Sequence, residues 1–517
     1  MQTDTLGYVD AIRRARAAQP EATSSVFGAR RSTWAQTADH VGRLAGGLRA
    51  LGVRDGDRVA VLAANSDRYL ELYLAVPWSG GVIVPLNSRW TAEENRLAIE
   101  DCEPTVICVG EGVDPASLAL IEALGATIST VLMTDAPAPE GWTPWAALAA
   151  ADPIEDAGRR GSDLFGIFYT GGTTGRSKGV MLSHGGVVSN SLAMRETGLF
   201  PQGCAGLIIP PLFHLAAGGA MSSMLLAGGA VVILPSFDPE TALATISEQG
   251  VTDVLLVPTM IQMLLDSPGF APERLGGLQR IVYGASAIAE STLDRIIAAA
   301  PHIDFHQAYG MTEVSCAATL LAPAFHLGEH RAAGRHRSAG QAMSITQLMI
   351  VDPAGEPVPT GGVGEILIRG SGLMLGYWRQ PELTAEALAG GWMHTGDGGR
   401  MDELGFVYVV DRLKDMIVTG GENVYSAEVE SALARHPDIA QCAVIAVPDP
   451  RWGERVHADI VLRPGATLTE DEVIAHCRAA IAGYKCPRSM TFWTTPLPMS
   501  AAGKIAKQAL RDRFKTA

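Results

Sequence analysis

The residues best suited to chemistry form a stretch rich in glycine and threonine, YTGGTTGRSKGV, at residues 169–180. Its glycines allow backbone N–H groups to turn toward a ligand, and its hydroxyls and one ammonium group add further donors. Donors of these kinds favour an anion, and a phosphate is the first candidate. The apolar segment DLFGIF, residues 163–168, comes directly before it, so we expect this loop to follow a buried strand.

Two other interpretations of this loop can be weighed by spacing. A Walker A loop needs lysine directly after its second glycine, whereas Arg176 and Ser177 separate Gly175 from Lys178. The spacing therefore excludes that class of nucleotide hydrolase. Residues 175–179 do match the G-x-S-x-G nucleophile elbow, so a serine hydrolase with Ser177 as nucleophile is the rival hypothesis. An elbow strand runs straight into the first glycine, and the intervening TGGTT disfavours it.

Four further motifs follow the loop in order, and they are more specific together than any one alone. They are QAYGMTE (307–313), WMHTGD (392–397), DRLKDMIVTGGENVYSAEVE (411–430) and AAGKIAK (501–507). With these motifs the chain resembles the adenylate-forming (ANL) superfamily, which includes acyl-CoA synthetases, 4-coumarate-CoA ligases, luciferases and peptide-synthetase adenylation domains. The loop departs from the usual T-S-G-T-T-G-x-P-K-G pattern at Gly171 and Ser177.

The resemblance implies an ATP-dependent, AMP-forming carboxylic acid–CoA ligase that uses ATP, Mg²⁺ and coenzyme A. A substrate carboxylate attacks the α-phosphate of ATP to give an acyl-adenylate and pyrophosphate, and the CoA thiol then displaces AMP. Both nucleophiles belong to substrates, so the protein has to position reactants and neutralise charge.

The resemblance also implies which residues bind ATP. The phosphates are expected at Thr170, Gly171, Gly172, Thr173, Thr174, Gly175 and Lys178, and the adenine at Gly284, Ala285, Ser286, Gln307, Ala308, Tyr309, Gly310 and Met311. Thr312 is expected to contact the α-phosphate, and Glu313, with Thr170, to ligate Mg²⁺, which favours oxygen ligands.

The remaining expected site residues lie in the later motifs. Asp397 is expected to accept hydrogen bonds from both ribose hydroxyls, with Arg412 assisting at the ribose or phosphate. Lys414 corresponds to the hinge of a rotating C-terminal domain, and Lys504 to the lysine that stabilises charge during adenylation after that domain closes.

The same motifs suggest where CoA binds. Gly420 and Gly421 are expected to let the backbone pass close to the pantetheine arm. Lys485 is either a contact of the CoA phosphates or a plain surface lysine.

The expected acyl pocket offers no fixed cationic partner. The resemblance places it in FHLAAGGAM, GASAIAE and VSCAATLL, which are dominated by Ala, Gly, Ser, Cys and Met. His214 is expected to gate the pocket or to bond a phenol there, or else to be a structural histidine. An uncharged tail is therefore favoured, either a medium- or long-chain fatty acid or an arylpropenoic acid such as a hydroxycinnamate. The alternatives are a stand-alone enzyme that loads a carrier protein, a luciferase-like oxygenase, and a nucleotide-binding regulator without turnover.

Repeated alternation of apolar strands and amphipathic helices must position these residues. It predicts an α/β fold: a large N-terminal domain of stacked, mostly parallel, helix-covered sheets with a β-rich part after Ala339, and a small α+β C-terminal domain. The resemblance, with its hinge near Lys414, implies that the domains span residues 1–411 and 412–517 and that the second is mobile. Thr33 and Gln36 form a capping-box pattern at the start of one helix. The uncharged segment 207–235 is broken by proline and glycine pairs, which favours a buried β-α-β unit over a membrane span.

Bulk properties limit the partners and the compartment. The net charge of −15 argues against binding of nucleic acid, and seven dispersed cysteines without a C-x-x-C pair indicate reduced thiols. No apolar signal segment is visible in residues 1–20. We therefore expect a cytoplasmic monomer or homodimer without integral membrane association that acts on a small carboxylic acid.

Overall fold

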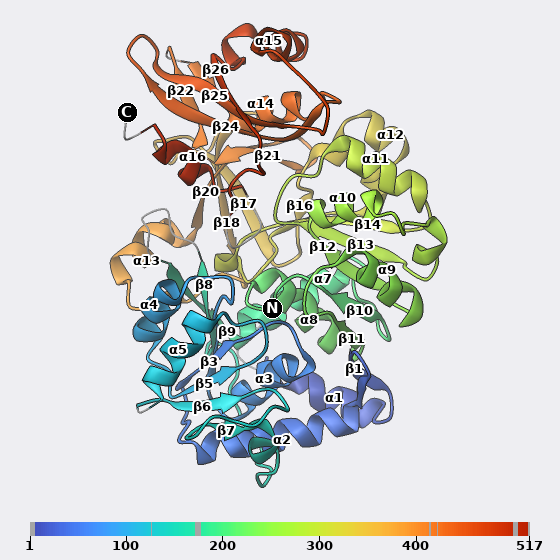
Figure 1. Cartoon of the computed structure of the whole chain (residues 1–517), viewed down its shortest axis with the longest axis vertical. Helices are drawn as coiled ribbons and strands as arrows, with labels where there is room; N and C mark the ends of the chain where they lie inside the picture. Colours follow the sequence, from blue (N-terminus) through green and yellow to red (C-terminus); the bar gives the residue numbers. More distant parts are fainter. Residues whose placement is uncertain are drawn as a thin grey trace. The chain divides into compact units, whose positions relative to one another are not determined.

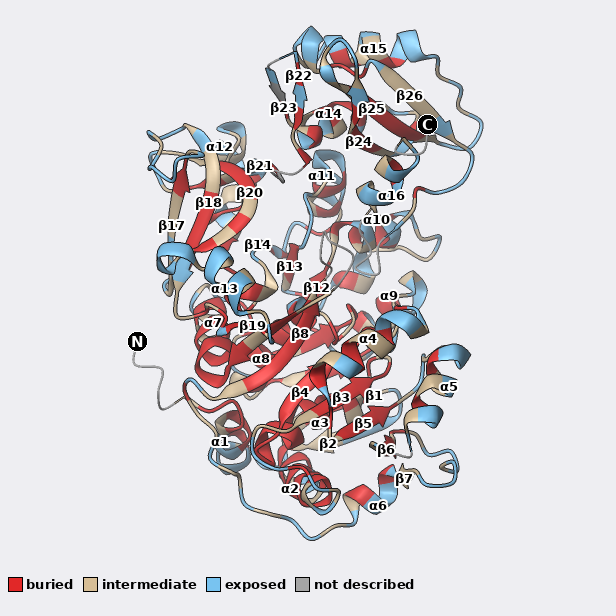
Figure 2. Cartoon of the chain, turned by 90° about the vertical axis from the view of Figure 1, so that its left-hand side faces the viewer, coloured by how far each residue is buried: buried red, intermediate tan, exposed pale blue. Residues whose placement is uncertain are grey.

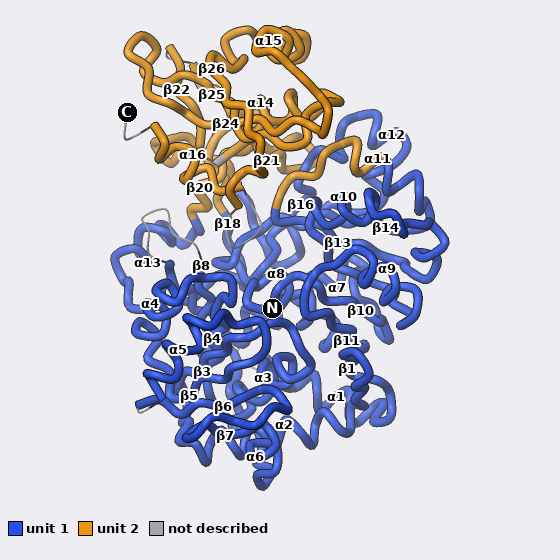
Figure 3. The backbone as a smooth tube through the Cα atoms, in the orientation of Figure 1, with its two compact units in different colours: residues 1–285, 295–348, 368–393 blue, residues 286–294, 349–367, 394–517 orange. Residues whose placement is uncertain are grey.

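The computed structural model describes residues 6–125, 127–170, 177–412, 415–420, 422–499 and 505–514. The chain divides into two compact units (Figure 3). The first comprises Met1–Ala285, Arg295–Leu348 and Ile368–Met393, and the second comprises Ser286–Asp294, Met349–Leu367 and His394–Ala517. The domain boundary expected between residues 411 and 412 stays a prediction.

A nine-stranded sheet in the first unit is parallel in its centre and antiparallel at both edges. Its strands, in spatial order, are β16 (Gln341–Ala342), β15 (Thr319–Leu321), β14 (Asp304–Tyr309), β13 (Arg280–Gly284), β12 (Asp253–Leu256), β10 (Ala205–Ile208), β11 (Ala230–Ile233), β1 (Thr23–Phe27) and β2 (Arg30–Thr33). The parallel centre confirms the expected βα series, and it brings the carboxyl ends of β13 and β14 together.

An eight-stranded sheet in the same unit contains the two strands that flank the expected phosphate loop. Its strands, in spatial order, are β19 (Gly376–Tyr377), β9 (Lys178–Ser183), β8 (Leu164–Thr170), β4 (Val82–Pro85), β3 (Arg58–Leu62), β5 (Val106–Val109), β6 (Ser129–Leu132) and β7 (Thr143–Pro144). Strands β9 and β19 are antiparallel additions at one edge. Figure 1 shows β3 and β5 beside helices α4 and α5.

Helices cover these sheets, so the strands are buried while the outer helix faces are exposed (Figure 2). The helices before the C-terminal region are α1 (Asp10–Ala18), α2 (Trp34–Ala50), α3 (Asp67–Trp78), α4 (Ala92–Cys102), α5 (Pro115–Leu124), α6 (Trp145–Ala149), α7 (His184–Glu196), α8 (Leu215–Leu226), α9 (Pro239–Glu248), α10 (Pro258–Asp266), α11 (Glu290–Ala299), α12 (Gly328–Ala332) and α13 (Pro381–Ala387).

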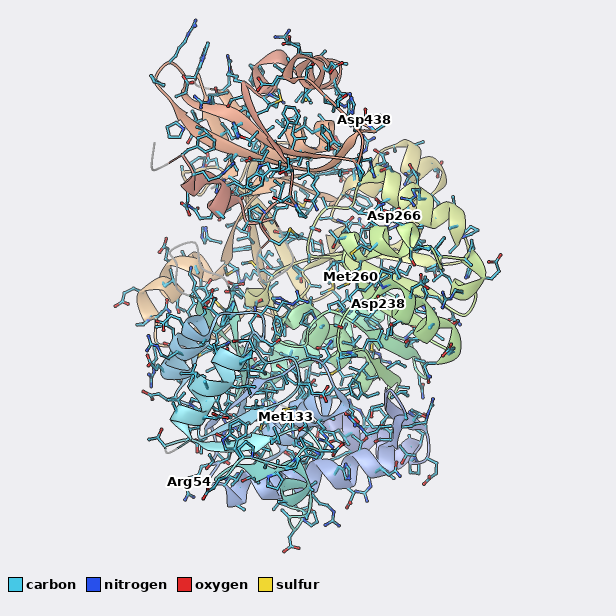
Figure 4. The ribbon with its side chains drawn as sticks, in the orientation of Figure 1. Arg54, Met133, Asp238, Met260, Asp266 and Asp438 are labelled. Atoms are coloured by element: carbon cyan, nitrogen blue, oxygen red, sulfur yellow. The ribbon has the colours of Figure 1, made fainter. Side chains whose placement is uncertain are left out.

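Local signals explain where several helices begin. Thr33 accepts a hydrogen bond from the backbone N–H of Gln36, whose side chain accepts from the Thr33 N–H, so the predicted capping box is present at α2. Asp238, labelled in Figure 4, accepts from the Thr241 N–H at 2.8 Å and begins α9. These side chains satisfy N–H groups that the first turn of a helix leaves unpaired.

The uncharged segment 207–235 forms β10, α8 and β11, as predicted. Gly228 has a φ of 64°, in the left-handed region, and this permits the tight turn between α8 and β11. In the described part of the chain, no helix is long and apolar enough to cross a membrane.

The β-rich part and the C-terminal region form two further sheets. One has the order β17 (Thr346–Val351), β18 (Val363–Gly370), β20 (Met393–Met401) and β21 (Val407–Arg412). The other contains β23 (Glu422–Val424), β22 (Ile417–Thr419), β25 (Gly453–Leu462), β24 (Ile439–Asp449) and, beside β25, β26 (Ser489–Trp493). Helices α14 (Ser426–Leu433), α15 (Glu470–Arg478) and α16 (Lys507–Asp512) accompany the second sheet.

Candidate active site

The expected phosphate loop connects two antiparallel strands. Thr170, at the end of β8, lies opposite Lys178, at the start of β9. Gly179 has to lack a side chain, because a Cβ there would lie 2.8 Å from Ile167 and 3.2 Å from Trp378. The pairing therefore fixes both ends of the loop, while the predicted residues between them lie outside the described part of the chain: Gly171, Gly172, Thr173, Thr174 and Gly175.

This hairpin rules out the serine-hydrolase hypothesis. A nucleophile elbow requires a helix directly after the serine. Ser177 is instead followed by strand β9, and helix α7 begins only at His184. The G-x-S-x-G match is therefore a coincidence of spacing.

Tyr377 contacts two predicted site residues that are distant in sequence. Its hydroxyl donates a hydrogen bond to Glu313 Oε1 at 2.9 Å, and Lys178 Nζ lies 5.1 Å from the centre of its ring. Burial, together with the neighbouring Glu313 carboxylate, raises the pKa of Tyr377 far above its usual value. The phenol thus stays protonated and remains a donor to Glu313.

Glu313 sits in a short 3₁₀ turn, η2 (Thr312–Val314), that neighbouring segments hold firmly. Its side chain is buried, and its backbone carbonyl accepts from the Met374 N–H at 2.8 Å. Asn190 of α7 donates to the carbonyls of Val314 at 3.2 Å and Ala317 at 2.6 Å. Sequence reasoning missed Tyr377 and Asn190, since both reach the site through partners more than sixty residues away.

The expected adenine-binding segments lie at the ends of neighbouring strands. Gly284 of β13 pairs with Ala308 of β14, and a Cβ at Gly284 would approach the Ala308 oxygen to 2.4 Å. A Cβ at Gly310 would lie 2.2 Å from the Cys316 oxygen. Both positions therefore require glycine. The other expected residues here are partly buried or exposed: Ala285, Ser286, Gln307, Tyr309, Met311 and Thr312.

His214 is the N-cap residue of α8, and its ring centre lies 4.6 Å from that of Phe213. The first turns of α8 pack tightly. Gly218 meets the Tyr73 hydroxyl and Gly219 meets Cys316, each at 3.0 Å from an added Cβ. The structure thus brings two of the expected acyl-site segments, around Gly219 and Cys316, into contact.

In the second unit, Asp397 follows a sharply bent backbone. Its side chain is buried, and it lies opposite Arg412 in the β20–β21 pairing. Gly396 has a φ of 67°, in the left-handed region. The Asp397 N–H donates to Thr395 Oγ1 at 3.0 Å, so the bend that presents Asp397 is held by hydrogen bonds.

Gly420 lies close to Trp452, while its expected role beside the pantetheine arm stays a prediction. It has a φ of 62°, its N–H donates to the Trp452 carbonyl at 2.8 Å, and a Cβ would lie 2.9 Å from the Trp452 ring. The guanidinium carbons of Arg451 and Arg488 lie 4.8 Å and 4.3 Å from the centre of that ring. Lys485 instead pairs with Glu428 at 2.7 Å.

Three predicted residues of the second unit, Lys414, Gly421 and Lys504, lie outside the described part of the chain. Met499 and Ile505 form an antiparallel bridge on either side of residues 500–504.

Comparison with known proteins gives the family. The profile described as "AMP-binding enzyme" matches residues 12–378, and "AMP-binding enzyme C-terminal domain" matches residues 428–504. A feruloyl-CoA synthase of an Amycolatopsis species is 40% identical over 509 residues, which is 97% of this chain and 98% of that protein. A long-chain-fatty-acid–CoA ligase of Thermus thermophilus is 35% identical over 94% of this chain and 90% of its own.

Solved structures agree with this fold. ATP-bound MatB from Rhodopseudomonas palustris superposes with a TM-score of 0.88 at 31% identity, covering 99% of both chains. The chain therefore belongs to the AMP-binding enzyme family, and it is an ATP-dependent, AMP-forming acyl-CoA synthetase of the adenylate-forming superfamily.

Proposed function

We propose that this enzyme forms CoA thioesters of uncharged carboxylic acids, with arylpropenoic acids of the ferulate type as the preferred class. The observation that carries the proposal is the 40% identity to feruloyl-CoA synthase over nearly the whole chain. Medium- or long-chain fatty acids are the second candidate, supported by the 35% identical long-chain-fatty-acid–CoA ligase.

The expected acyl segments suit an uncharged tail. Ser222 and Ser223 of α8 donate to the carbonyls of Gly218 at 2.6 Å and Gly219 at 2.9 Å, while the Tyr73 hydroxyl donates to the Leu212 carbonyl at 2.6 Å. These polar groups are thus satisfied by the protein itself. Residues 213–221 also contain no Asp, Glu, Lys or Arg. A charged tail would lose water there without gaining an opposite charge.

For the adenylation step, we assign Thr170 and Lys178 to the ATP phosphates and Thr312 to the α-phosphate. Glu313 suits Mg²⁺, which proteins usually bind through one or two carboxylates together with substrate phosphates. Glu313 offers one such carboxylate, since its side chain is buried and its Oε1 accepts a hydrogen bond from the Tyr377 hydroxyl at 2.9 Å. When bound, Mg²⁺ would neutralise charge on the phosphates.

Asp397 would hold the ribose hydroxyls, and Arg412 would assist. Lys504 would stabilise the charge that develops as the carboxylate attacks, and rotation of the C-terminal domain near Lys414 would then replace it with the CoA-binding surface. In these roles the anionic Asp397 accepts hydrogen bonds from hydroxyl groups, and the cationic Lys504 stabilises negative charge.

Coenzyme A would bind beside Gly420 and Gly421. The guanidinium groups of Arg451 and Arg488 lie against the Trp452 ring next to this glycine turn and supply two cations there. Such a surface suits a phosphorylated nucleotide. Because Lys485 is already paired with Glu428, we assign it a structural role.

Loading of a carrier protein is the alternative acceptor reaction. A fatty acid–[acyl-carrier-protein] ligase, ScoC of Streptomyces coeruleorubidus, is 33% identical over 514 residues. We place the reaction in the cytoplasm, since all seven cysteines are free. The quaternary state we propose is a monomer or homodimer, which sedimentation would distinguish.

The test measures AMP release with ATP, Mg²⁺ and CoA for ferulate, cinnamate, octanoate and palmitate, with a phosphopantetheinylated carrier protein as the competing acceptor. Lys504→Ala should lose adenylation yet still pass chemically made acyl-adenylate to CoA. Arg14→Ala, on the exposed face of α1, is the matched control and should behave as the wild type.

Each outcome has a definite meaning. Higher kcat/KM for ferulate than for the fatty acids supports the proposed class, and the reverse order supports the second candidate. Absence of AMP with every acid contradicts the proposal. Equal loss of both half-reactions in Lys504→Ala contradicts the role of that lysine.

A further inference from the structure

The backbone that presents Asp397 depends on the neighbouring strand β18. Gly396, directly before Asp397, has a φ of 67°, and its N–H donates to Glu365 Oε1 at 2.9 Å. The other oxygen of the same carboxylate, Oε2, lies 2.9 Å from His394 Nδ1. One carboxylate thus binds residues on both sides of Thr395.

The residue after Glu365 continues this attachment. Thr395 Oγ1 donates to the Ile366 carbonyl at 2.7 Å and accepts from the Asp397 N–H at 3.0 Å. Glu365 and Ile366 therefore hold the whole bend of residues 394–397. Of the side chains in this group, Thr395 and Asp397 are buried, while that of Glu365 is 19% exposed.

We propose that Glu365 is a positioning residue that fixes the Gly396 bend and thereby aims the Asp397 carboxylate at the ribose of ATP. A left-handed backbone is only one of several conformations open to glycine. The hydrogen bond from the Gly396 N–H to an ionised acceptor selects it, and such charge-assisted bonds are stronger than neutral ones. The inference rests on the proposed role of Asp397.

The experiment compares the binding and use of three nucleotides: ATP, 2′-deoxy-ATP and 3′-deoxy-ATP. Calorimetry gives the Kd of each without turnover, and AMP formation gives kcat/KM. A residue that only stabilises the fold would weaken all three nucleotides alike. A residue that aims Asp397 would weaken ATP most, because ATP alone has both hydroxyls that Asp397 is proposed to bind.

Three variants separate the contacts. Glu365→Ala removes the contacts with both Gly396 and His394. We expect the Kd of ATP to rise about tenfold, and the ratio of the Kd of each deoxy nucleotide to that of ATP to fall toward one. Glu365→Gln should restore most of that preference, because its oxygen can accept from Gly396 while its amide donates to the other tautomer of His394. His394→Ala removes only the partly exposed contact and should change Kd by less than about threefold.

Asp397→Ala supplies the reference for complete loss of ribose recognition, and Glu365→Ala/Asp397→Ala should be no worse for ATP than Asp397→Ala alone. The inference is overturned if Glu365→Ala, with an unchanged melting temperature, keeps the wild-type preference for ATP. It is also overturned if Asp397→Ala keeps that preference. If the wild type binds ATP but forms no AMP with any acid, the proposed function fails, while the nucleotide preferences still decide the role of Glu365.

Discussion

Replacing Tyr377 by phenylalanine isolates one contact in the expected metal and phosphate region. The change removes the hydroxyl that donates to Glu313 Oε1 at 2.9 Å and leaves the ring that lies 5.1 Å from Lys178 Nζ. Because Tyr377 and Glu313 are both buried, water cannot easily replace the lost donor.

The expected effect follows from the strength of this contact. A hydrogen bond to a charged group contributes about 1.5–3 kcal/mol. If the orientation of Glu313 matters for adenylation, kcat/KM should fall roughly tenfold to about a hundredfold, at about 1.4 kcal/mol for each factor of ten. The burial and the negative neighbour that raise the pKa of Tyr377 keep its phenol protonated, so this loss should not depend on pH between 6 and about 9.

Pyrophosphate exchange across a Mg²⁺ titration is the assay, since it reports adenylation without CoA. Tyr8→Phe is the matched control, because Tyr8 is also buried and its hydroxyl lies 2.9 Å from Ser222 Oγ, a neutral partner on α8. We expect both variants to lower the melting temperature, and only Tyr377→Phe to raise the Mg²⁺ concentration needed for half-maximal exchange. Equal Mg²⁺ dependence in the wild type and both variants would refute this reasoning.

Three further changes test other parts of the structure. Burial lowers the pKa of His184 to about 4, so as pH falls the unfolded chain binds the proton before the folded chain does. The free energy of unfolding should therefore fall by about 1.4 kcal/mol per pH unit as pH drops from about 6.5 to 4. Urea unfolding at several pH values in this range should show a weaker dependence of that free energy on pH for His184→Gln than for the wild type. Trp452→Ala should raise KM for CoA several-fold and leave KM for ATP unchanged, measured by thioester formation, because it removes the ring that Arg451 and Arg488 flank. Gly310→Ala should lower both melting temperature and kcat/KM for ATP by more than the control Gly483→Ala, since its Cβ would meet a backbone oxygen at 2.2 Å, whereas nothing lies within 4 Å of a Cβ at Gly483.

The regular elements were predictable because their signals are local. The capping box at Thr33 and Gln36 needs only residues three apart, and the buried strands of 205–208 and 230–233 are short apolar runs bounded by turn residues. The paired prolines and glycines in the uncharged segment correctly predicted a β-α-β unit rather than a span. The resemblance to a known family likewise depended on contiguous motifs.

The contacts that position the site could not be predicted in this way. Strand β19 pairs with β9 although nearly two hundred residues separate them, and this pairing brings Tyr377 to Lys178. The sequence pattern around Glu365 predicts a strand in the β-rich part, but it does not predict the hydrogen bonds of Glu365 to residues 394–396. One available signal was a carboxylate within the apolar run GEILI, since a half-buried acid in a strand needs a partner.

Glu365 and Tyr377 share a chemical role that explains why residues 363–377 matter beyond their place in the sheets. Each forms a hydrogen bond that orients one of the two expected acidic site residues. Glu365 accepts from the backbone N–H of Gly396, directly before Asp397, and Tyr377 donates to the carboxylate of Glu313. The reaction needs no protein nucleophile, so its rate depends on charges that are already oriented when ATP arrives. A double-mutant comparison of Glu365→Ala and Tyr377→Phe should therefore give independent losses, the first in ribose preference and the second in Mg²⁺ dependence. The side chain of Glu365 pairs with His394 and Gly396, whereas the hydroxyl of Tyr377 pairs with Glu313. Strong coupling between these losses would show that one rearrangement underlies both and that the two carboxylates are not positioned separately.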